Sequence, residues 1–424
     1  MALIVLITTV IMYALIILYP HRKVYFSLGA ALLFIILSIV TPREALSQMV
    51  NWNVLMIFLG SQLIASLFLY SRVPLWIADT LIDVSPNPGI AITLILLMTG
   101  FVSAFVDNVS TVLVMAPLAL VLSKRLSMDP TYFMVGLAVM ANLQGTATLV
   151  GDPPSMIFAD YAHYGFNDFF VYQGRPSIFF AVQFGMLCGA LFLYAYFAKT
   201  KHTRIMVEKE PIISLVPTIL LLTMIGSLAI ISFVERGLSP VAGYAVLSIA
   251  TLGLLWFRFV QKKTTRETFE VLKKFDWEAF LFLIGIFIVV GTITKVGWVE
   301  KIGALLAGLI GGNVIVGFML IILVSLLLSG FIDNIPYILV MLPVADRLAK
   351  TLSLRPELYM FGLLIGSCMG GNITPFGASA NVVSVGILKR EGISLSFFQW
   401  LKIGLPFTLI TTGGAALFVW LFWK

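Results

Sequence analysis

The chain has 424 residues, of which 60% are hydrophobic and only 11% are charged, and its formal net charge is +7. Soluble globular domains carry about 25% charged residues and about 45–50% apolar ones, so this composition excludes a water-soluble fold and indicates a protein of the lipid bilayer. The positive charge suits basic loops against anionic lipid better than it suits a nucleic-acid partner.

The apolar runs are long and continuous, so they favour helices over a closed barrel. The first run, residues 2–19, has no basic stretch before it and no small-residue cleavage site after it, so we expect a span and not a signal peptide. An all-α polytopic membrane protein with ten transmembrane helices is predicted, in chain order at 2–19, 24–40, 53–70, 132–158, 176–198, 212–233, 238–257, 278–294, 358–388 and 401–422.

Two further apolar segment pairs are too short to cross the bilayer comfortably, and each is interrupted by an Asp-Asn dipeptide. The first pair covers about 90–123 and is broken at Asp107-Asn108, and the second covers about 313–346 and is broken at Asp333-Asn334. We interpret both pairs as re-entrant hairpins. Residues 73–84 and 298–310 are expected to be short connecting helices.

The chain repeats itself when it is shifted by 226 positions. The matches include aspartate, asparagine, proline, threonine and glycine, which a shared apolar composition does not explain: Asp107 with Asp333, Asn108 with Asn334, Pro117 with Pro343, Thr148 with Thr374, and Gly151 with Gly377. We therefore predict repeat 1 at 1–198, a basic cytoplasmic linker at 199–211 and repeat 2 at 212–424. Five spans in each repeat would invert the second relative to the first, as in many secondary transporters.

The basic residues of the loops support this arrangement. With Lys402 left aside, nine lysines and arginines fall on one side and 17 on the other, and the second group includes Arg22 and Lys23. The positive-inside rule makes the richer side cytoplasmic and puts both termini outside. Full crossing by all segments would give both halves one orientation, and the short hairpin arms argue against it.

Three aspartates stand at presumed membrane depth: Asp107, Asp333 and Asp152. A carboxylate there must be paired, protonated or bound to a cation. No lysine or arginine occurs in the same segments, so we predict these three as the ion-coupling residues. A Na⁺ ion is expected near Asp107, Asn108, Asp333 and Asn334. The alternative is that each aspartate only caps a half-helix.

The other polar residues at this depth lie at the two tips and in two breaks rich in glycine and proline, "NLQGTATLVGDPPS" from Asn142 and "GGNITPFGASAN" from Gly370. Broken helices survive in a membrane where they line a cavity, and their freed backbone groups can bind ions. The predicted substrate-binding residues are Asn108, Ser110, Thr111, Asn142, Gly145, Thr146, Thr148, Gly151, Asn334, Gly371, Asn372, Thr374, Gly377, Ser379 and Asn381.

The motifs "FVDN", "GTATLVGDPPS" and "GASANVV" resemble the ion transporter superfamily, which includes citrate and dicarboxylate carriers, the arsenite permease, NhaD-type sodium/proton antiporters and the P protein. The resemblance implies a homodimer whose protomers have a scaffold domain and an elevator-like transport domain. It also places Asn108 and Asn334 at hairpin tips. Dicarboxylate carriers have Ser-Asn-Thr at both tips, whereas here aspartate precedes each asparagine and would repel a di- or tricarboxylate.

We therefore expect a secondary active transporter of a small ion or anion (arsenite-like, inorganic anion or carboxylate), coupled to H⁺ or Na⁺. A Na⁺/H⁺ antiporter and, in a different class, an ion channel stay open as alternatives. The sequence has no P-loop, HExxH or GxSxG motif, so we expect no enzyme and no cofactor beyond the coupling ion. The expected location is a bacterial or archaeal inner membrane.

Overall fold

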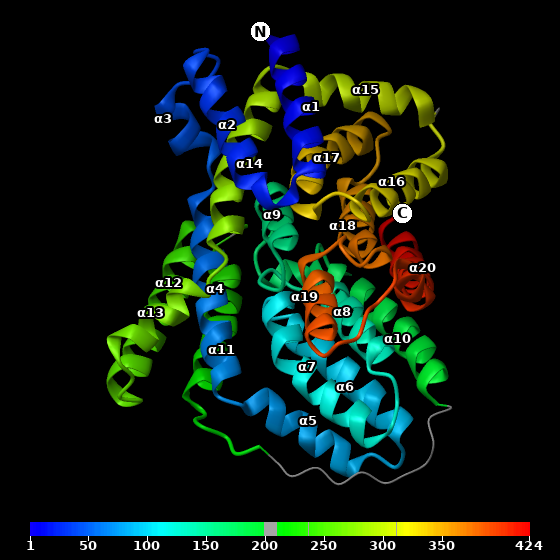
Figure 1. The fold of residues 1–424 in the computed structure, drawn as a ribbon. Coiled ribbons are helices and arrows are strands. Elements are labelled where there is room, and N and C mark those ends of the chain that lie inside the picture. The colour runs from blue at the N-terminus through cyan, green and yellow to red at the C-terminus, as the bar shows by residue number, and fades with distance from the viewer. Residues whose placement is uncertain (199–209, 236, 311) are drawn as a thin grey trace.

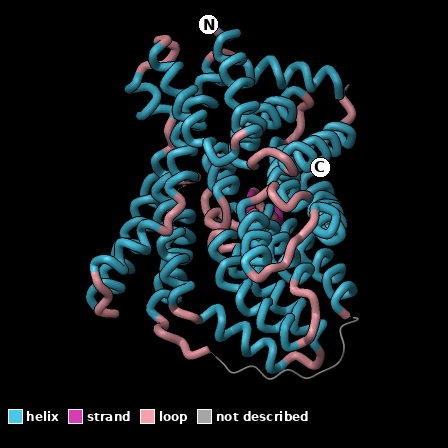
Figure 2. The backbone as a smooth tube through the Cα atoms, viewed as in Figure 1, coloured by secondary structure: helices cyan, strands magenta, loops and turns pink. Residues whose placement is uncertain are grey.

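The computed structural model describes residues 1–198, 210–235, 237–310 and 312–424. The expected linker at 199–211 therefore lies outside the described residues except for its last two positions. The fold is almost entirely helical (Figure 2). A two-residue antiparallel strand pair, β1 (Val171–Tyr172) and β2 (Arg175–Pro176), pairs Val171 with Pro176 and Tyr172 with Arg175.

The first half of the chain begins with α1 and α2 and continues through a hairpin and a broken segment. Its helices are α1 (Ala2–Leu18), α2 (Lys23–Ile36), α3 (Pro42–Glu44), α4 (Trp52–Tyr70), α5 (Val73–Val84), α6 (Pro88–Ser103), α7 (Asn108–Arg125), α8 (Thr131–Gly145), α9 (Pro153–Ala162) and α10 (Ile178–Phe197).

The second half follows the same order from α14 onward. Its helices are α11 (Val216–Val234), α12 (Pro240–Leu255), α13 (Thr265–Lys273), α14 (Trp277–Lys295), α15 (Trp298–Ile310), α16 (Val314–Ser329), α17 (Asn334–Thr351), α18 (Pro356–Gly370), α19 (Ser379–Arg390) and α20 (Phe397–Trp423). Helices α6 and α16, like α7 and α17, begin and end 226 residues apart. The division into two repeats stays a prediction.

Local capping explains why the hairpin helices begin where they do. Asn87 accepts a hydrogen bond from the Ile90 N–H before α6, and Asn313 accepts one from the Val316 N–H before α16. Asp107 and Asp333 cap α7 and α17 in the same way. Each cap satisfies a backbone donor that the helix leaves free.

Seven helices among the described residues are long and apolar enough to cross a membrane: α4, α7, α10, α11, α12 with its continuation to Val260, α14 and α20. These seven helices qualify by length and composition alone, so the ten spans expected from the sequence stay a prediction. Helices α1 and α2 are shorter than 18 residues, and two expected spans are each divided in two, into α8 and α9 and into α18 and α19. The span expected at 24–40 ends at Ile36, and Ser38 then adopts a positive φ of 55°.

Large apolar side chains remain exposed along the long helices. Leu191 on α10, Phe233 on α11 and Leu421 on α20 are 69%, 83% and 69% exposed. So many large apolar side chains exposed along the helices would be unfavourable in water. The surface is that of a protein that contacts lipid.

The helices pack into two units. In the flanking unit, α4 packs against α11 and α12, and α14 packs against α1 and α2. The hairpin unit contains α6–α10 and α16–α20, and it is joined across the two halves by contacts of α8 with α19 and of α9 with α17. Figure 1 shows α5 lying along one end of the molecule and α15 along the opposite end.

Candidate functional site

Both hairpin tips and both breaks meet at one small cavity of about 70 Å³. The tips are the turns at 104–107 and 330–333, and the breaks are the segments between α8 and α9 and between α18 and α19. The hairpin unit supplies most of the wall, and the flanking unit closes it. The flanking residues are Lys23, Phe58, Gln62, Asp276 and Ala279.

Seven of the predicted site residues line this cavity: Asp107, Asn108, Asn142, Asp152, Asp333, Asn334 and Ser379. They come from two stretches of the chain, 107–152 and 333–379, and the fold brings the two stretches together. The other predicted residues are not part of the cavity wall: Ser110, Thr111, Gly145, Thr146, Thr148, Gly151, Gly371, Asn372, Thr374, Gly377 and Asn381.

The aspartates of the two tips act as helix caps as well as lining the cavity. The Asp107 Oδ2 accepts a hydrogen bond of 2.8 Å from the Ser110 N–H, and the Asp333 Oδ1 accepts one of 3.2 Å from the Ile335 N–H. Helices α9 and α19 also begin at the cavity. Four helix N-termini therefore point toward the same small space, where their partial positive charges partly offset the carboxylates.

Asn108 links the first tip to the first break. Its Oδ1 accepts a hydrogen bond of 2.7 Å from the Ser103 hydroxyl, and its Nδ2 donates one of 3.1 Å to Asp152 Oδ2. Asn108 is only 7% exposed. This hydrogen bond positions the Asp152 carboxyl group in the cavity wall.

Three buried asparagines join the two breaks. The Nδ2 of Asn142 donates hydrogen bonds of 2.8 Å to both Asn372 Oδ1 and Asn381 Oδ1. Asn381 Nδ2 in turn donates to the carbonyls of Gly371 and Thr374, each at 2.8 Å. Because Asn372 and Asn381 are fully buried behind the wall, their amides hold the breaks in place and do not face the cavity.

The matched threonines and glycines of the two breaks have matched packing roles. Thr148 donates its hydroxyl to the Ala104 carbonyl of the first tip, and Thr374 donates at 2.6 Å to the Gly330 carbonyl of the second. A Cβ on Gly151 would meet the Gly145 carbonyl at 2.5 Å, and one on Gly377 would meet the Gly371 carbonyl at 2.6 Å. These residues position the breaks against the tips.

Lys23 corrects two expectations from the sequence. We expected Arg22 and Lys23 in a cytoplasmic loop, and we expected the aspartates to bind a proton or Na⁺ because their own membrane segments contain no lysine or arginine. Instead the ammonium of Lys23 lies 2.7 Å from Asp333 Oδ2 in the cavity wall. The pair α1–α2 turns back beside the start of α17 (Figure 1), where the Tyr13 hydroxyl donates to the Pro336 carbonyl at 3.0 Å.

Gln62 and Asp276 were also missed. Asp276 caps α14 by accepting a hydrogen bond of 2.8 Å from the Ala279 N–H, and its own N–H donates to Gln62 Oε1 at 3.3 Å. The signal for Lys23 was present in the sequence, since a lysine in the first turn of a helix opposes the helix dipole. Gln62 lies inside an apolar run, where a side-chain amide is unfavourable unless it forms a hydrogen bond.

Four carboxylates and one ammonium line the cavity: Asp107, Asp152, Asp276 and Asp333, with Lys23. Like charges in a small, partly desolvated space repel strongly, so the excess of carboxylates favours a bound cation or proton. Among the described residues no three acidic, histidine or cysteine side chains could hold a metal ion together. A Na⁺ ion here would need amide and backbone oxygens as well.

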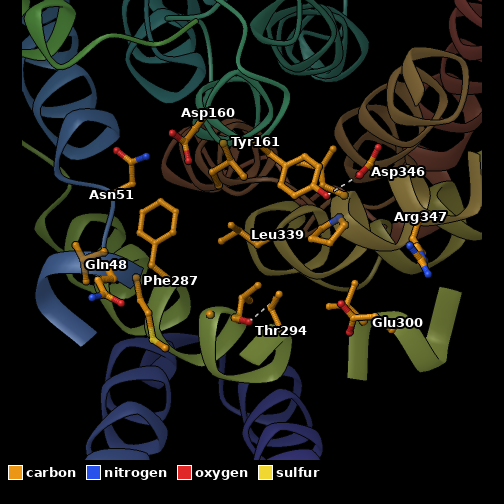
Figure 3. Close-up of a pocket in the computed structure, with 18 of the residues that line it drawn as sticks. Gln48, Asn51, Asp160, Tyr161, Phe287, Thr294, Glu300, Leu339, Asp346 and Arg347 are labelled. Atoms are coloured by element: carbon orange, nitrogen blue, oxygen red, sulfur yellow. Dashed lines mark hydrogen bonds between the residues drawn. The ribbon is translucent and has the colours of Figure 1, made fainter. Parts of the chain in front are cut away.

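A second cavity, of about 760 Å³, lies between α9 and α17 on one side and α4, α14 and α15 on the other (Figure 3). Tyr161 donates its hydroxyl to Asp346 at 3.2 Å there, and Lys350 pairs with Asp346 at 2.7 Å. None of the predicted site residues lines it. The smaller cavity is therefore the candidate site, because the tips, breaks and buried polar network all converge on it.

Comparison with known proteins identifies a family of membrane transporters. The family model described as citrate transporter matches residues 13–366. An uncharacterized transporter of Mycobacterium tuberculosis is 31% identical over 381 residues, which cover 88% of this chain and 86% of the relative. The P protein of Mus musculus is 26% identical and matches 92% of this chain but only 56% of its own length.

Two solved transporters share the fold. The YdaH transporter of Alcanivorax borkumensis superposes with a TM-score of 0.61 at 13% identity, covering 92% of this chain and 87% of the other. MtrF of Neisseria gonorrhoeae gives a TM-score of 0.59 at 16% identity, covering 92% and 83%. The chain is thus an integral membrane transporter, and it belongs to the citrate transporter family of the ion transporter superfamily.

Proposed function

We propose that the protein is a secondary active transporter that moves a small ion or anion across the membrane in exchange for, or together with, H⁺ or Na⁺. One observation carries the proposal: two helical hairpins and two broken segments present their polar ends to a single cavity. Irregular backbone at membrane depth is tolerated where it lines such a site, and discontinuous helices at a repeat interface are a common way to build it.

The two-unit packing supports alternating access as the proposed mechanism. The hairpin unit carries most of the cavity, whereas the flanking unit contributes one wall. A shift of the hairpin unit against the flanking unit would expose the cavity to one side and then the other. The elevator movement, the re-entrant character of the hairpins and the homodimer belong to this proposal.

The charge of the cavity limits the substrate. A free di- or tricarboxylate would meet an excess of carboxylates, so it would need compensating cations to bind. The proposed substrates are therefore small solutes that cross with a cation or proton: a neutral arsenite-like solute, an inorganic anion or a carboxylate that brings cations. Asp107 and Asp152 would bind the coupling ion, while Asn108, Asn142, Asn334 and Ser379 contact the solute.

A Na⁺/H⁺ antiporter is the second candidate, and the same observation favours it. Four carboxylates face one ammonium in the cavity, so a cation could itself be the substrate, with protons and Na⁺ binding alternately. Exchange of this kind would require no other solute. Saturable ²²Na⁺ uptake driven by a pH gradient alone would select this candidate.

The test is a flux screen in proteoliposomes. Arsenite, phosphate, sulfate, citrate, succinate and ²²Na⁺ would each be offered with an imposed pH gradient, an imposed Na⁺ gradient or neither. We expect saturable, gradient-driven uptake of at least one solute, lost in Asp107→Asn. The control is Glu391→Gln, an exposed acidic residue after α19. Flux that neither saturates nor responds to gradients would contradict the proposal and favour a channel.

A further inference from the structure

Lys23 forms an ion pair that joins the two units at the cavity. Its ammonium is 2.7 Å from Asp333 Oδ2, and the two side chains are only 20% and 27% exposed. The residues are 310 positions apart in sequence. Because the pair is mostly shielded from water, its charges interact more strongly than an exposed pair would.

The position of Lys23 is unfavourable for its own helix. It is the first residue of α2, where the helix dipole presents its positive end and disfavours a cation. The other helix in the contact, α17, also begins at the pair and is capped by Asp333. Helix stability therefore does not explain why an ammonium lies at this place. The ion pair with Asp333 explains it.

Contacts within the flanking unit hold Lys23. The ammonium lies 4.9 Å from the centroid of the Phe282 ring on α14, within the range of a cation–π contact. One turn further along α2, Ser27 packs so closely on α14 that a Cβ on Gly285 would meet its Oγ at 2.6 Å. Lys23 thus belongs to the flanking unit, while Asp333 belongs to the second hairpin tip.

The first tip has no such partner. The Asp107 carboxylate accepts its hydrogen bond from its own helical turn, and in the described part of the chain no ion pair involves it. Among the described charged residues that line the cavity, Lys23 alone is positive. It therefore neutralises one carboxylate at the second tip and leaves Asp107 and Asp152 at the first tip and first break without a cation.

We propose that Lys23 is a built-in counter-cation that sets how strongly the cavity binds an exchangeable cation and where that cation sits. This inference rests on the proposed function. Lys23 takes the place of one cation at Asp333, so the exchangeable Na⁺ or H⁺ binds near Asp107 and Asp152. The pair Lys23–Asp333 is electrically neutral, so removing both charges together should leave the cation affinity nearly unchanged.

The experiment is a double-mutant cycle on the purified full chain in detergent. Thermal unfolding is followed while Na⁺ replaces choline at constant ionic strength, and separately while pH is lowered, and the half-effect concentration of each ion is read from the shift in Tm. The variants are Lys23→Met, Asp333→Asn and the double variant. Lys23→Arg is the matched control, because it keeps the charge.

Removing the ammonium should lower the half-effect concentration by about tenfold, because one unit charge several ångströms away acts on the bound cation. Asp333→Asn leaves the ammonium unpaired, so by the same reasoning the half-effect concentration should rise by about tenfold. The double variant should return to within about twofold of the wild type, as coupled charges do in such cycles. Lys23→Arg should stay near the wild type.

The outcomes separate the two proposals. Single variants that shift Tm without moving the half-effect concentration would show a purely structural ion pair and overturn the role of Lys23 alone. Additive effects, with no return in the double variant, would also overturn it. A wild type that responds to neither Na⁺ nor H⁺ would contradict the proposed cation coupling, and the role of Lys23 with it.

Discussion

The two hairpin tips begin their second helices alike, with an aspartate that caps the helix and an asparagine as its first residue. Their partners differ. Asp333 is bound to Lys23, whereas within the described part of the chain Asp107 is held by its own turn alone. The breaks differ as well, since Asp152 in the first break is replaced by Ala378 at the matching position of the second.

From this difference we infer that the two matched halves share one backbone frame, whereas the proposed cation chemistry belongs to the first half alone. The backbone contacts are matched in both halves. Thr148 and Thr374 each donate a hydrogen bond to a carbonyl of a hairpin tip, and Gly151 and Gly377 each pack closely against a carbonyl of their own break. The charged groups are not matched, because one tip is neutralised by the flanking unit. We therefore propose that the coupling ion binds in the first half, and that the polar side chains of the second half contact the solute.

The largest effect is expected from the carboxylates of the first half. Asp107→Asn or Asp152→Asn should reduce gradient-driven uptake by about a hundredfold, since losing a charged partner worth about 2–3 kcal/mol gives a factor of that size. Uptake by proteoliposomes under imposed pH and Na⁺ gradients measures this. Glu391→Gln should keep the wild-type rate. Coupled uptake that survives in both aspartate variants would refute the asymmetry.

The second prediction asks whether the backbone frame is symmetric. Gly151→Ala and Gly377→Ala should each destabilise the protein by about 3 kcal/mol, because the new Cβ would press on a carbonyl that cannot easily move. The two losses should be similar. Thermal unfolding in detergent measures them, and Gly386→Ala, which has no atom within 4 Å of its new Cβ, is the control. A large effect in one half only would break the comparison.

The third prediction concerns the asparagine cluster, in which Asn142 of the first half donates to both asparagines of the second half. Asn142→Ala should destabilise the fold by about 1–2 kcal/mol, because two buried acceptors lose their partner. The matching position in the second half is Cys368, a buried residue, and Cys368→Ala should be milder. Unfolding midpoints of the two variants decide this, and equal losses would mean that packing, not hydrogen bonding, dominates there.

The smallest effects are expected outside the membrane, where the halves differ in their connections. The pKa of Glu267 in α13 is lowered to about 2, mainly because its carboxylate accepts hydrogen bonds from the Thr264 N–H and hydroxyl. Because the pKa of Glu267 is lowered on folding, its ionised carboxylate stabilises the folded state above the ordinary pKa of 4.5. This contribution to the free energy of unfolding is lost as the pH falls toward 2. Glu267→Gln should thus leave uptake at neutral pH within about twofold of the wild type, the range expected for an exposed substitution. A larger loss would bring α13 into the transport mechanism.

Much of the hairpin unit could be predicted from the sequence. Asn87-Pro88, Asp107-Asn108 and Asp333-Asn334 mark the starts of α6, α7 and α17. Glycine and proline mark the two breaks. These residues can be recognised in the sequence because they act through local backbone geometry. The connecting helices α5 and α15 have the expected bounds. The matched spacing of the two halves pairs the tips and the breaks with one another, and the structure shows that all four meet at one cavity.

The wall from the flanking unit could not be predicted in the same way. Whether the α1–α2 turn reaches the cavity depends on how α2 packs on α14, which no local pattern records. Asn372 and Asn381 have the composition of binding residues, yet packing directs them away from the cavity. Spacing finds which residues come together, but it does not tell which of them face the open space.

The most direct test of the central claim compares Asp107→Asn with the double variant Lys23→Met/Asp333→Asn in one proteoliposome uptake experiment under an imposed cation gradient. The account predicts that Asp107→Asn loses gradient-driven uptake while the double variant, which removes a neutral pair, retains it. Retained coupling in Asp107→Asn together with lost coupling in the double variant would place the coupling ion at the second tip and contradict the account.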